Sequence, residues 1–403
     1  MHKRALIAAA ICTLAAAHAA CAQDAIARGR YLAAVGDCTG CHASANGSPY
    51  SGGQPLAAGF GTVYSSNITP DRQTGIGNWT QQQFYEAMHD GIRANGAHLY
   101  PAFPYAYFTH ASRADTDAIY AYLQSVPPVH ALPPANRLLF PFNIRAVVWF
   151  WNRMYLDTSA FQSDPSQSAA WNRGAYLING LGHCGGCHTP KNALFGDQMN
   201  KAFTGADLDH WFAANLRPDT LDGLGRWSAP DIVEYLKTGR NRYAAAAGSM
   251  QEVVMRSTSH MSDGDLTAIA TYLTALPALP GHAVAEPEAR AMQAGETVFV
   301  QSCAICHAPA DAGQPPDYPK LSNNPLVNGS DPATVLRIIL QGAQSAATAN
   351  AHTGYSMPAF VALSDEEIAN VATYIRNAWG NRASAVRRED VRSLRATLGA
   401  RQN

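Results

Sequence analysis

The feature that most constrains this chain is a five-residue pattern, Cys-x-x-Cys-His, that occurs three times. Its copies are Cys38-Thr39-Gly40-Cys41-His42, Cys184-Gly185-Gly186-Cys187-His188 and Cys303-Ala304-Ile305-Cys306-His307. This spacing is the attachment pattern for c-type haem, because the thiols bond the porphyrin vinyl groups and the histidine ligates the iron. The sequence therefore predicts three haems c. Their attachment residues are Cys38, Cys41, Cys184, Cys187, Cys303 and Cys306, and their proximal iron ligands are His42, His188 and His307.

Zinc sites and redox dithiols also use a Cys-x-x-Cys pair. A zinc site needs a second ligand pair near the first, and a thioredoxin-like pair gains nothing from a histidine in the next position. All six cysteines beyond residue 21 lie in the three motifs. The repeated pattern therefore favours haem attachment over both alternatives.

The first 22 residues have the composition of a secretory signal. Lys3 and Arg4 precede an alanine-rich apolar run, and Ala20-Cys21-Ala22 offers a cleavage site before Gln23. The alternatives are an uncleaved membrane anchor, for which the apolar run is short, and a lipoprotein attached through Cys21. Because bacterial haem c is attached outside the cytoplasm, we expect a periplasmic protein.

Length and repetition predict the domain organisation. A chain of 403 residues is long enough for two or three domains, and three motifs favour three. Each motif follows a glycine and an aromatic residue and precedes an amphipathic helix with an acidic first turn, which suits the helix dipole. We therefore expect an all-α fold of three tandem class I cytochrome c-like haem domains. The expected segments are a signal peptide (1–22), domain 1 (23–130), an aromatic Pro-rich linker (131–165), domain 2 (166–278), a linker (279–288), domain 3 (289–380) and an Arg-rich tail (381–403).

The linker over 131–165 is the most apolar and aromatic part of the mature chain. Arg145 and Arg153 interrupt it and Pro141 breaks it, so a transmembrane helix is not expected. It either packs between domains or forms a surface for a partner subunit or the membrane, since aromatic residues and arginine are common interface anchors. The charged tail is either a solvated face or a docking segment for an acidic partner or anionic lipid.

Methionines before the closing helices are the candidate distal ligands. Met250 lies 62 residues after His188, in the loop Gly248-Ser249-Met250, and Met357 lies 50 residues after His307. A thioether there suits a low-spin electron-transfer haem of relatively high potential. The alternative is ordinary core packing, and Met255 and Met261 compete for the role in the second domain.

The first repeat departs from this pattern, because Phe103 stands where a methionine is expected. Met88 is the only methionine of that domain, and we interpret it as a core residue. His98 and His110 flank Phe103, and we expect His98 to be the distal iron ligand of the first haem. An open sixth coordination position is the main alternative.

Several stretches resemble a known family. They are the three motifs, Asn67-Ile68-Thr69-Pro70-Asp71 with Thr74 to Trp79, Leu99 to Tyr105, Ser249 to Val254, and Met357-Pro358-Ala359-Phe360. With these, the mature chain resembles the three-haem cytochrome c subunits of bacterial membrane-associated alcohol, gluconate, sorbitol and fructose dehydrogenases. The Tyr-Pro-Ala-Phe-Pro-Tyr version around Phe103 looks more like the cytochromes paired with molybdenum hydroxylases.

The resemblance implies electron transfer from a catalytic dehydrogenase subunit, whether molybdenum hydroxylase, flavoprotein or quinoprotein, to ubiquinone or a terminal oxidase. No catalytic motif of a hydrolase or nucleotide enzyme is present, so substrate oxidation is expected in the partner. A haem enzyme that uses an open first haem and a free soluble electron shuttle are the alternatives. Membrane contact, if it occurs, is expected to be peripheral. A formal net charge of −1 gives no indication of a nucleic-acid partner.

Overall fold

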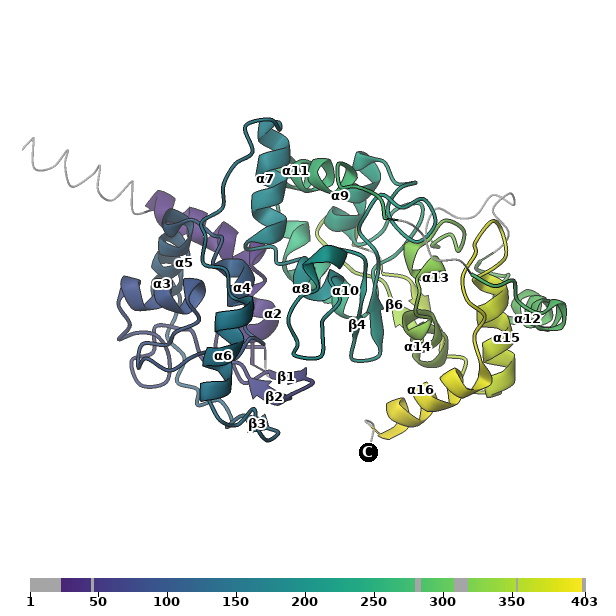
Figure 1. Cartoon of the computed structure of the whole chain (residues 1–403), viewed down its shortest axis with the longest axis horizontal. Helices are drawn as coiled ribbons and strands as arrows, with labels where there is room; N and C mark the ends of the chain where they lie inside the picture. Colours follow the sequence, from purple (N-terminus) through teal and green to yellow (C-terminus); the bar gives the residue numbers. More distant parts are fainter. Residues whose placement is uncertain (1–22, 45–46, 280–283, 308–317, 353, 401–403) are drawn as a thin grey trace, which may run out of the picture. The chain divides into compact units, whose positions relative to one another are not determined.

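The computed structural model describes residues 23–44, 47–279, 284–307, 318–352 and 354–400. The predicted signal peptide and residues 280–283 of the second linker lie outside the described residues. The described part is mostly helical, as expected (Figure 1). It falls into two compact units, one formed by residues up to 162 with 180–182 and the other by residues 163–179 with 183 onward.

The first unit contains one motif and the aromatic segment that follows it. Its helices are residues 23–35, α2 (Cys38–His42), α3 (Gln81–His89), α4 (Tyr105–Phe108), α5 (Arg113–Ser125) and α6 (Ala146–Tyr155). Its strands β1 (Pro55–Ala58), β2 (Gly61–Tyr64) and β3 (Arg137–Leu138) form a small antiparallel sheet in that order.

The second unit contains the other two motifs. Its first part has α7 (Ala169–Asn179), α8 (Gly185–His188), the 3₁₀ turns η1 (Met199–Lys201) and η2 (Thr258–His260), β4 (Ala206–Leu208), β5 (Trp211–Ala213), α9 (Ala229–Thr238), α10 (Ser249–Arg256) and α11 (Asp263–Thr274). Its second part has α12 (Ala289–Ser302), α13 (Pro325–Asn328), α14 (Ala333–Gln341), β6 (Ala343–Gln344), β7 (Ser356–Met357), α15 (Asp365–Ile375) and α16 (Arg388–Ala400). The strands form two hairpin pairs, β4–β5 and β6–β7, which the all-α expectation did not include.

A helix crossing recurs beside each motif. In each segment a glycine of the helix before the motif packs directly against the backbone of the closing helix. The pairs are Gly29 with Ala118, Gly174 with Ala268 and Gly295 with Asn370. A Cβ at these glycines would lie 1.9, 2.0 and 2.1 Å from the facing carbonyl oxygen, closer than any side chain allows. The same backbone contact therefore organises all three segments.

Local sequence explains where the closing helices begin. Ser112, Ser262 and Ser364 are their N-caps, and each side chain accepts a hydrogen bond from the backbone N–H three residues on. In the first two segments an arginine just before the crossing glycine also binds the closing helix. Arg28 Nε donates to Asp115 at 2.8 Å, and Arg173 donates twice to Asp265 at 2.7 and 2.8 Å.

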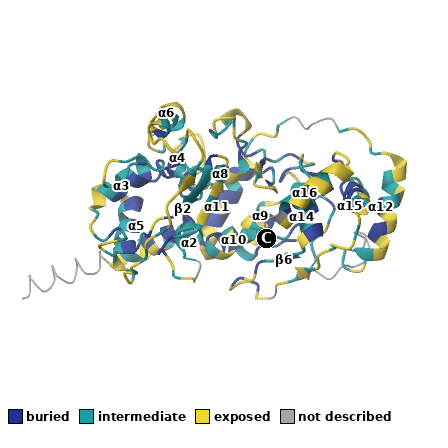
Figure 2. Ribbon diagram, turned by 90° about the horizontal axis from the view of Figure 1, so that it is seen from below, coloured by how far each residue is buried: buried dark blue, intermediate teal, exposed yellow. Residues whose placement is uncertain are grey.

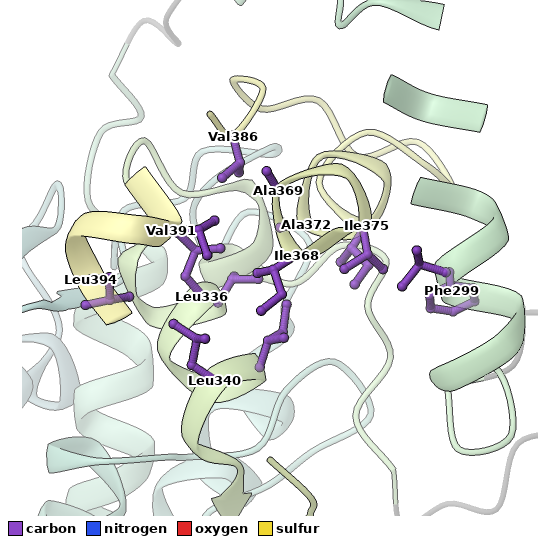
Figure 3. Packing of buried hydrophobic residues seen from close by; sticks show 14 of the residues in the cluster. Phe299, Leu336, Leu340, Ile368, Ala369, Ala372, Ile375, Val386, Val391 and Leu394 are labelled. Carbon is purple, nitrogen blue, oxygen red and sulfur yellow. The ribbon is translucent and has the colours of Figure 1, made fainter. Parts of the chain in front are cut away.

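The C-terminal segment completes the core around the third motif. Val391, Leu394 and Leu398 of α16 are buried in the cluster that Phe299, Leu336 and Ile368 also form (Figure 3). Arg395 binds Asp365 at 2.9 Å, at the start of α15. The segment expected as an Arg-rich tail is thus, over α16, part of the third folded segment, because its apolar residues recur at helical spacing.

The segment expected as an aromatic linker packs onto the first unit. Its β3 pairs with β2, and Asn152 of α6 accepts a hydrogen bond from the Tyr105 hydroxyl at 2.6 Å. Phe142 packs on Phe60, and its carbonyl accepts from the Tyr100 hydroxyl at 2.9 Å. Among the residues that the structure describes, every helix falls short of the length and apolar character needed to cross a bilayer.

Candidate functional site

The three motif histidines have one hydrogen-bond arrangement. The Nδ1 atom of His42 lies 2.6 Å from the Ser66 carbonyl, that of His188 lies 2.7 Å from the Ala214 carbonyl, and that of His307 lies 3.3 Å from the Pro319 carbonyl. A carbonyl only accepts, so Nδ1 carries the proton and Nε2 keeps its lone pair. Each ring is therefore oriented, with the nitrogen that can bind iron left available.

Each motif forms a helical turn. Residues Cys38–His42 are α2, Gly185–His188 are α8, and the third motif is closed by hydrogen bonds from the Cys306 and His307 N–H groups to the Cys303 carbonyl at 3.1 and 2.9 Å. At this spacing both cysteines and the histidine lie on the same side of the turn. The donor set therefore suits one cofactor that the two cysteines would anchor and the histidine would ligate.

Burial keeps these groups in neutral forms. It raises the pKa of the Cys38 and Cys184 thiols to about 12 and that of Cys303 to about 11. A redox dithiol has the opposite property, a lowered thiol pKa. Burial also lowers the pKa of all three motif histidines, which favours the neutral imidazole that ligates iron. The structure thus agrees better with haem attachment than with the redox-pair alternative.

A shared register identifies equivalent positions in the first two segments. Gly91 follows the C-cap of α3 and Gly239 is the C-cap of α9, with φ of 65° and 80°. Their carbonyls accept hydrogen bonds from the Leu99 and Ala246 N–H groups at the same distance of 2.7 Å. Counting four residues on from Leu99 and Ala246 leads to Phe103 and Met250, respectively. Phe103 packs against Tyr105 and Phe108 there. The aromatic residue thus has the same position in this count that Met250 has in the second segment, although Met250 lies in a helix and Phe103 in a turn before α4.

The two predicted distal methionines lie in different secondary structure, Met250 in a helix and Met357 in a strand. Met250 is in the first turn of α10 rather than in a loop as expected, because Gly248, with φ of 56°, ends the loop just before it. It packs with Tyr235 against Ala246, Val254 and Ala346. Met357 is in β7, opposite Ala343, and packs on the third core. The competitor Met255 is 41% exposed, whereas Met261 is buried.

His98 lies in the first unit, in contact with α6 and the residue before it. Its carbonyl accepts from Arg145 at 2.5 Å, and its ring Nδ1 lies 3.5 Å from the Asn152 amide. The rival His110 pairs its Nδ1 with the Ser159 carbonyl at 3.0 Å, and Met88 is buried on α3 as expected of a core residue.

One buried donor in the second segment fits a bound cofactor. Trp227 is 7% exposed and stacks on Tyr243 with ring centroids 5.7 Å apart, yet its Nε1 has no hydrogen-bond partner among the described residues. An unpaired buried N–H costs about 1–3 kcal/mol, so a polar group of a bound cofactor would satisfy it. The sequence showed that Trp227 matches Trp79, but gave no signal of this unpaired donor.

Neither the carbonyl partners of the histidines nor the crossing contacts were identified from sequence. Backbone acceptors have no residue-type signature, so the partners at Ser66, Ala214 and Pro319 had no local signal. The glycines of the crossings were visible ahead of each motif, and their repetition could have indicated a close contact.

Oriented imidazoles, paired thiols on helical turns and repeated helix crossings together define a c-type cytochrome. Residues 292–379 match the family described as Cytochrome c. The chain is 40% identical to the gluconate 2-dehydrogenase cytochrome c subunit of Pantoea cypripedii, over 93% of this chain and 90% of that protein. It is 39% identical to the cytochrome c subunit of alcohol dehydrogenase (quinone) of Gluconobacter oxydans, over 95% of this chain and 84% of that protein.

A nicotinate dehydrogenase polypeptide of Pseudomonas putida is also similar, with 40% identity over 87% of this chain and 30% of that protein. The chain belongs to the family of cytochrome c subunits of alcohol, gluconate and fructose dehydrogenases. The resemblance noted from the motifs is thereby confirmed.

Proposed function

We propose that this chain binds three haems c and relays electrons from a catalytic dehydrogenase subunit to ubiquinone or a terminal oxidase. The observation that carries the proposal is the threefold repetition of one donor set, in which each histidine is oriented by a backbone carbonyl. Three tandem class I cytochrome c-like domains, over 23–130, 166–278 and 289–380, would each hold one haem. The proposed location is the periplasm, with peripheral contact to the membrane.

The chain's residues would bind, orient and shield the cofactor. Bound haem iron supplies one-electron redox chemistry, and the protein tunes it through the axial ligand and burial. The paired cysteines would anchor each group, and the oriented imidazoles of His42, His188 and His307 would ligate through Nε2. Met250 and Met357 would each offer a thioether as a further ligand. In this proposal the organic substrate is oxidised in a partner subunit, as the names of the relatives suggest.

Contacts between the second and third segments support relay within the second unit. Thr334 at the start of α14 accepts from the Phe212 N–H at 2.7 Å and donates to the Phe212 carbonyl at 3.0 Å. The Arg240 guanidinium lies 5.1 Å from the centre of the Tyr355 ring, two residues before Met357. Ala346 packs into the cluster that contains Met250. The segments that contain Met250 and Met357 are thus in contact, which supports the proposal of electron transfer between them.

Replacing Met250 by leucine is expected to lower the potential of the second haem by on the order of 0.1 V, because the thioether ligand that favours reduced iron is lost. Potentiometric titration of the holoprotein, with the sulfur-to-iron charge-transfer band followed in parallel, checks this. Met255→Leu on the same helix is the matched control, and it should change neither the potential of the second haem nor the charge-transfer band. A shift caused by Met255→Leu alone would assign the ligand to Met255 instead.

Replacing His98 by alanine is expected to change the spectrum and potential of the first haem, since that haem would lose its distal imidazole. His110→Ala is the control, because the His110 ring already has a carbonyl partner. Carbon monoxide binding to the reduced variant should report the opened iron. If the wild-type protein binds carbon monoxide and His98→Ala alters no spectrum, the first haem is open. Phe103 in the methionine position is the observation that favours this alternative.

Co-purification tests the partner. Expression with the neighbouring genes should yield a complex with a catalytic dehydrogenase subunit. Two relatives are named as cytochrome c subunits of a gluconate dehydrogenase and an alcohol dehydrogenase. These names support the proposal that the catalytic subunit oxidises an organic substrate. Purification of the cytochrome alone, with electron exchange that needs no partner, would instead indicate a free soluble shuttle.

A further inference from the structure

An exposed apolar surface lies on α6 and the loop before it. We call it the α6 face, and its members are Leu139 (60% exposed), Phe140 (80%), Ile144 (48%), Trp149 (51%), Phe150 (61%) and Met154 (57%). Figure 2 colours much of this segment as exposed. Six large apolar side chains exposed within one short segment indicate an interaction site, because single exposed apolar residues are common but groups of them are not.

The polarity of α6 is unusual for a surface helix. Its inner side packs through Val148, Trp151 and Asn152, the last two on Tyr105. Its outer side should be polar, yet Trp149 and Phe150 stand there with Met154 at helical spacing. The folded first unit therefore leaves the apolar side chains on the outer side of α6 exposed to solvent.

Arginine outnumbers acidic residues around the α6 face. Residues 131–156 contain Arg137, Arg145 and Arg153, and the first acidic residue of this stretch is Asp157, just beyond the end of α6. Arg137 and Arg153 are exposed, and neither side chain forms a hydrogen bond or ion pair with another residue in the described part of the chain. Each such cation near an anionic lipid surface contributes roughly 1 kcal/mol of attraction.

We propose that the α6 face binds the anionic surface of a phospholipid bilayer, with its aromatic and aliphatic side chains at headgroup depth. A protein interface of this size would carry roughly one hydrogen bond per 100–200 Å². The α6 face instead consists of apolar side chains, with the exposed guanidinium groups of Arg137 and Arg153 in the same segment, a combination that suits a fluid lipid interface where no fixed hydrogen-bond partners are required.

This inference refines the peripheral contact in the proposed function and rests on it. It also has a consequence for the first haem segment. Arg145 and Asn152 connect this region to His98, and Trp151 packs on Tyr105 with ring centroids 6.3 Å apart. Lipid binding by α6 would therefore hold the distal loop of the first haem segment close to the bilayer, where ubiquinone resides.

Co-sedimentation of the mature holoprotein with vesicles tests the proposal, with haem absorbance as the readout. We expect binding to phosphatidylethanolamine–phosphatidylglycerol vesicles, and much weaker binding to phosphatidylcholine vesicles or at high salt. Trp149→Ser with Phe150→Ser should weaken binding by about tenfold or more, since two rings no longer enter the interface. Arg153→Glu should weaken it by about tenfold at low salt, because the variant repels the anionic surface.

Val361→Ser and Arg290→Glu are matched controls, since both sites are exposed and lie far along the chain from α6. They should bind vesicles like the wild type. Unchanged binding of the α6 variants, or equal losses in the controls, would overturn the proposal. If the wild type binds no vesicles and the α6 variants lose their dehydrogenase subunit, the face is a protein interface instead. Haem content and reduced spectra, measured on the same samples, report separately on the proposed relay.

Discussion

Replacing Gly174 by valine is expected to abolish folding of the second haem segment. A Cβ at Gly174 would lie 2.0 Å from the Ala268 carbonyl oxygen, 2.6 Å from the Ala268 carbonyl carbon and 2.8 Å from the Tyr272 Cβ, all in α11. Because these are largely backbone atoms in a helix, they cannot move aside, and α7 must separate from α11. The expected loss is more than about 4 kcal/mol of unfolding free energy. Denaturant unfolding followed by circular dichroism and haem absorbance measures it.

Gly264 provides the matched control within α11. The only atom a Cβ there would approach is the Ser262 hydroxyl oxygen, at 3.9 Å. Gly264→Ala should therefore keep stability or raise it by up to about 1 kcal/mol, because alanine loses less conformational entropy in a helix. If Gly174→Val unfolds at the same denaturant concentration as Gly264→Ala, the crossing does not organise this segment.

Replacing Cys184 and Cys187 together by serine is expected to give a protein with two covalent haems in place of three. Serine hydroxyls form no thioether bond to the vinyl groups, so the second haem is not retained after maturation. Intact mass of the purified protein should decrease by one haem, and haem absorbance per chain should fall by about a third. Relay through the second segment should stop, since its redox group is missing.

Cys21→Ser is the control for cysteine loss in general. Cys21 lies in the predicted signal peptide, so that variant should mature with all three haems. A wild-type mass that shows fewer than three added haems would contradict the proposed cofactor content itself. A double variant that keeps three haems would show that the second motif is not an attachment site.

Much of the architecture could be predicted because its signals are local. The N-cap serines and acidic first turns of α5, α11 and α15 act within four residues, and the structure has these helices. The match between the segments around Trp79 and Trp227 likewise reflects two loops with the same hydrogen bonds, from Ile76 to Thr69 and from Leu224 to Arg217. Repetition of short-range patterns was therefore a sound guide to the repeated fold.

Other features depend on residues that are distant in sequence. Met250 was expected in a loop, but the α10 helix starts one residue earlier, a boundary that Gly248 and its packing against Trp211 decide. The arginine-rich C-terminal segment looked polar from composition. Its Val391, Leu394 and Leu398 nevertheless recur at helical spacing, and only the third core shows what they cover.

The sequence alone determined the chemistry, because covalent haem attachment depends on two thiols and an imidazole within five residues. It also determined the helices whose caps and apolar spacing are local. Only the tertiary structure decided which carbonyl orients each imidazole, how closely the helices cross at Gly29, Gly174 and Gly295, and that α6 presents aromatic rings outward. These are long-range properties, since they depend on which distant backbone or side-chain groups meet once the chain is packed.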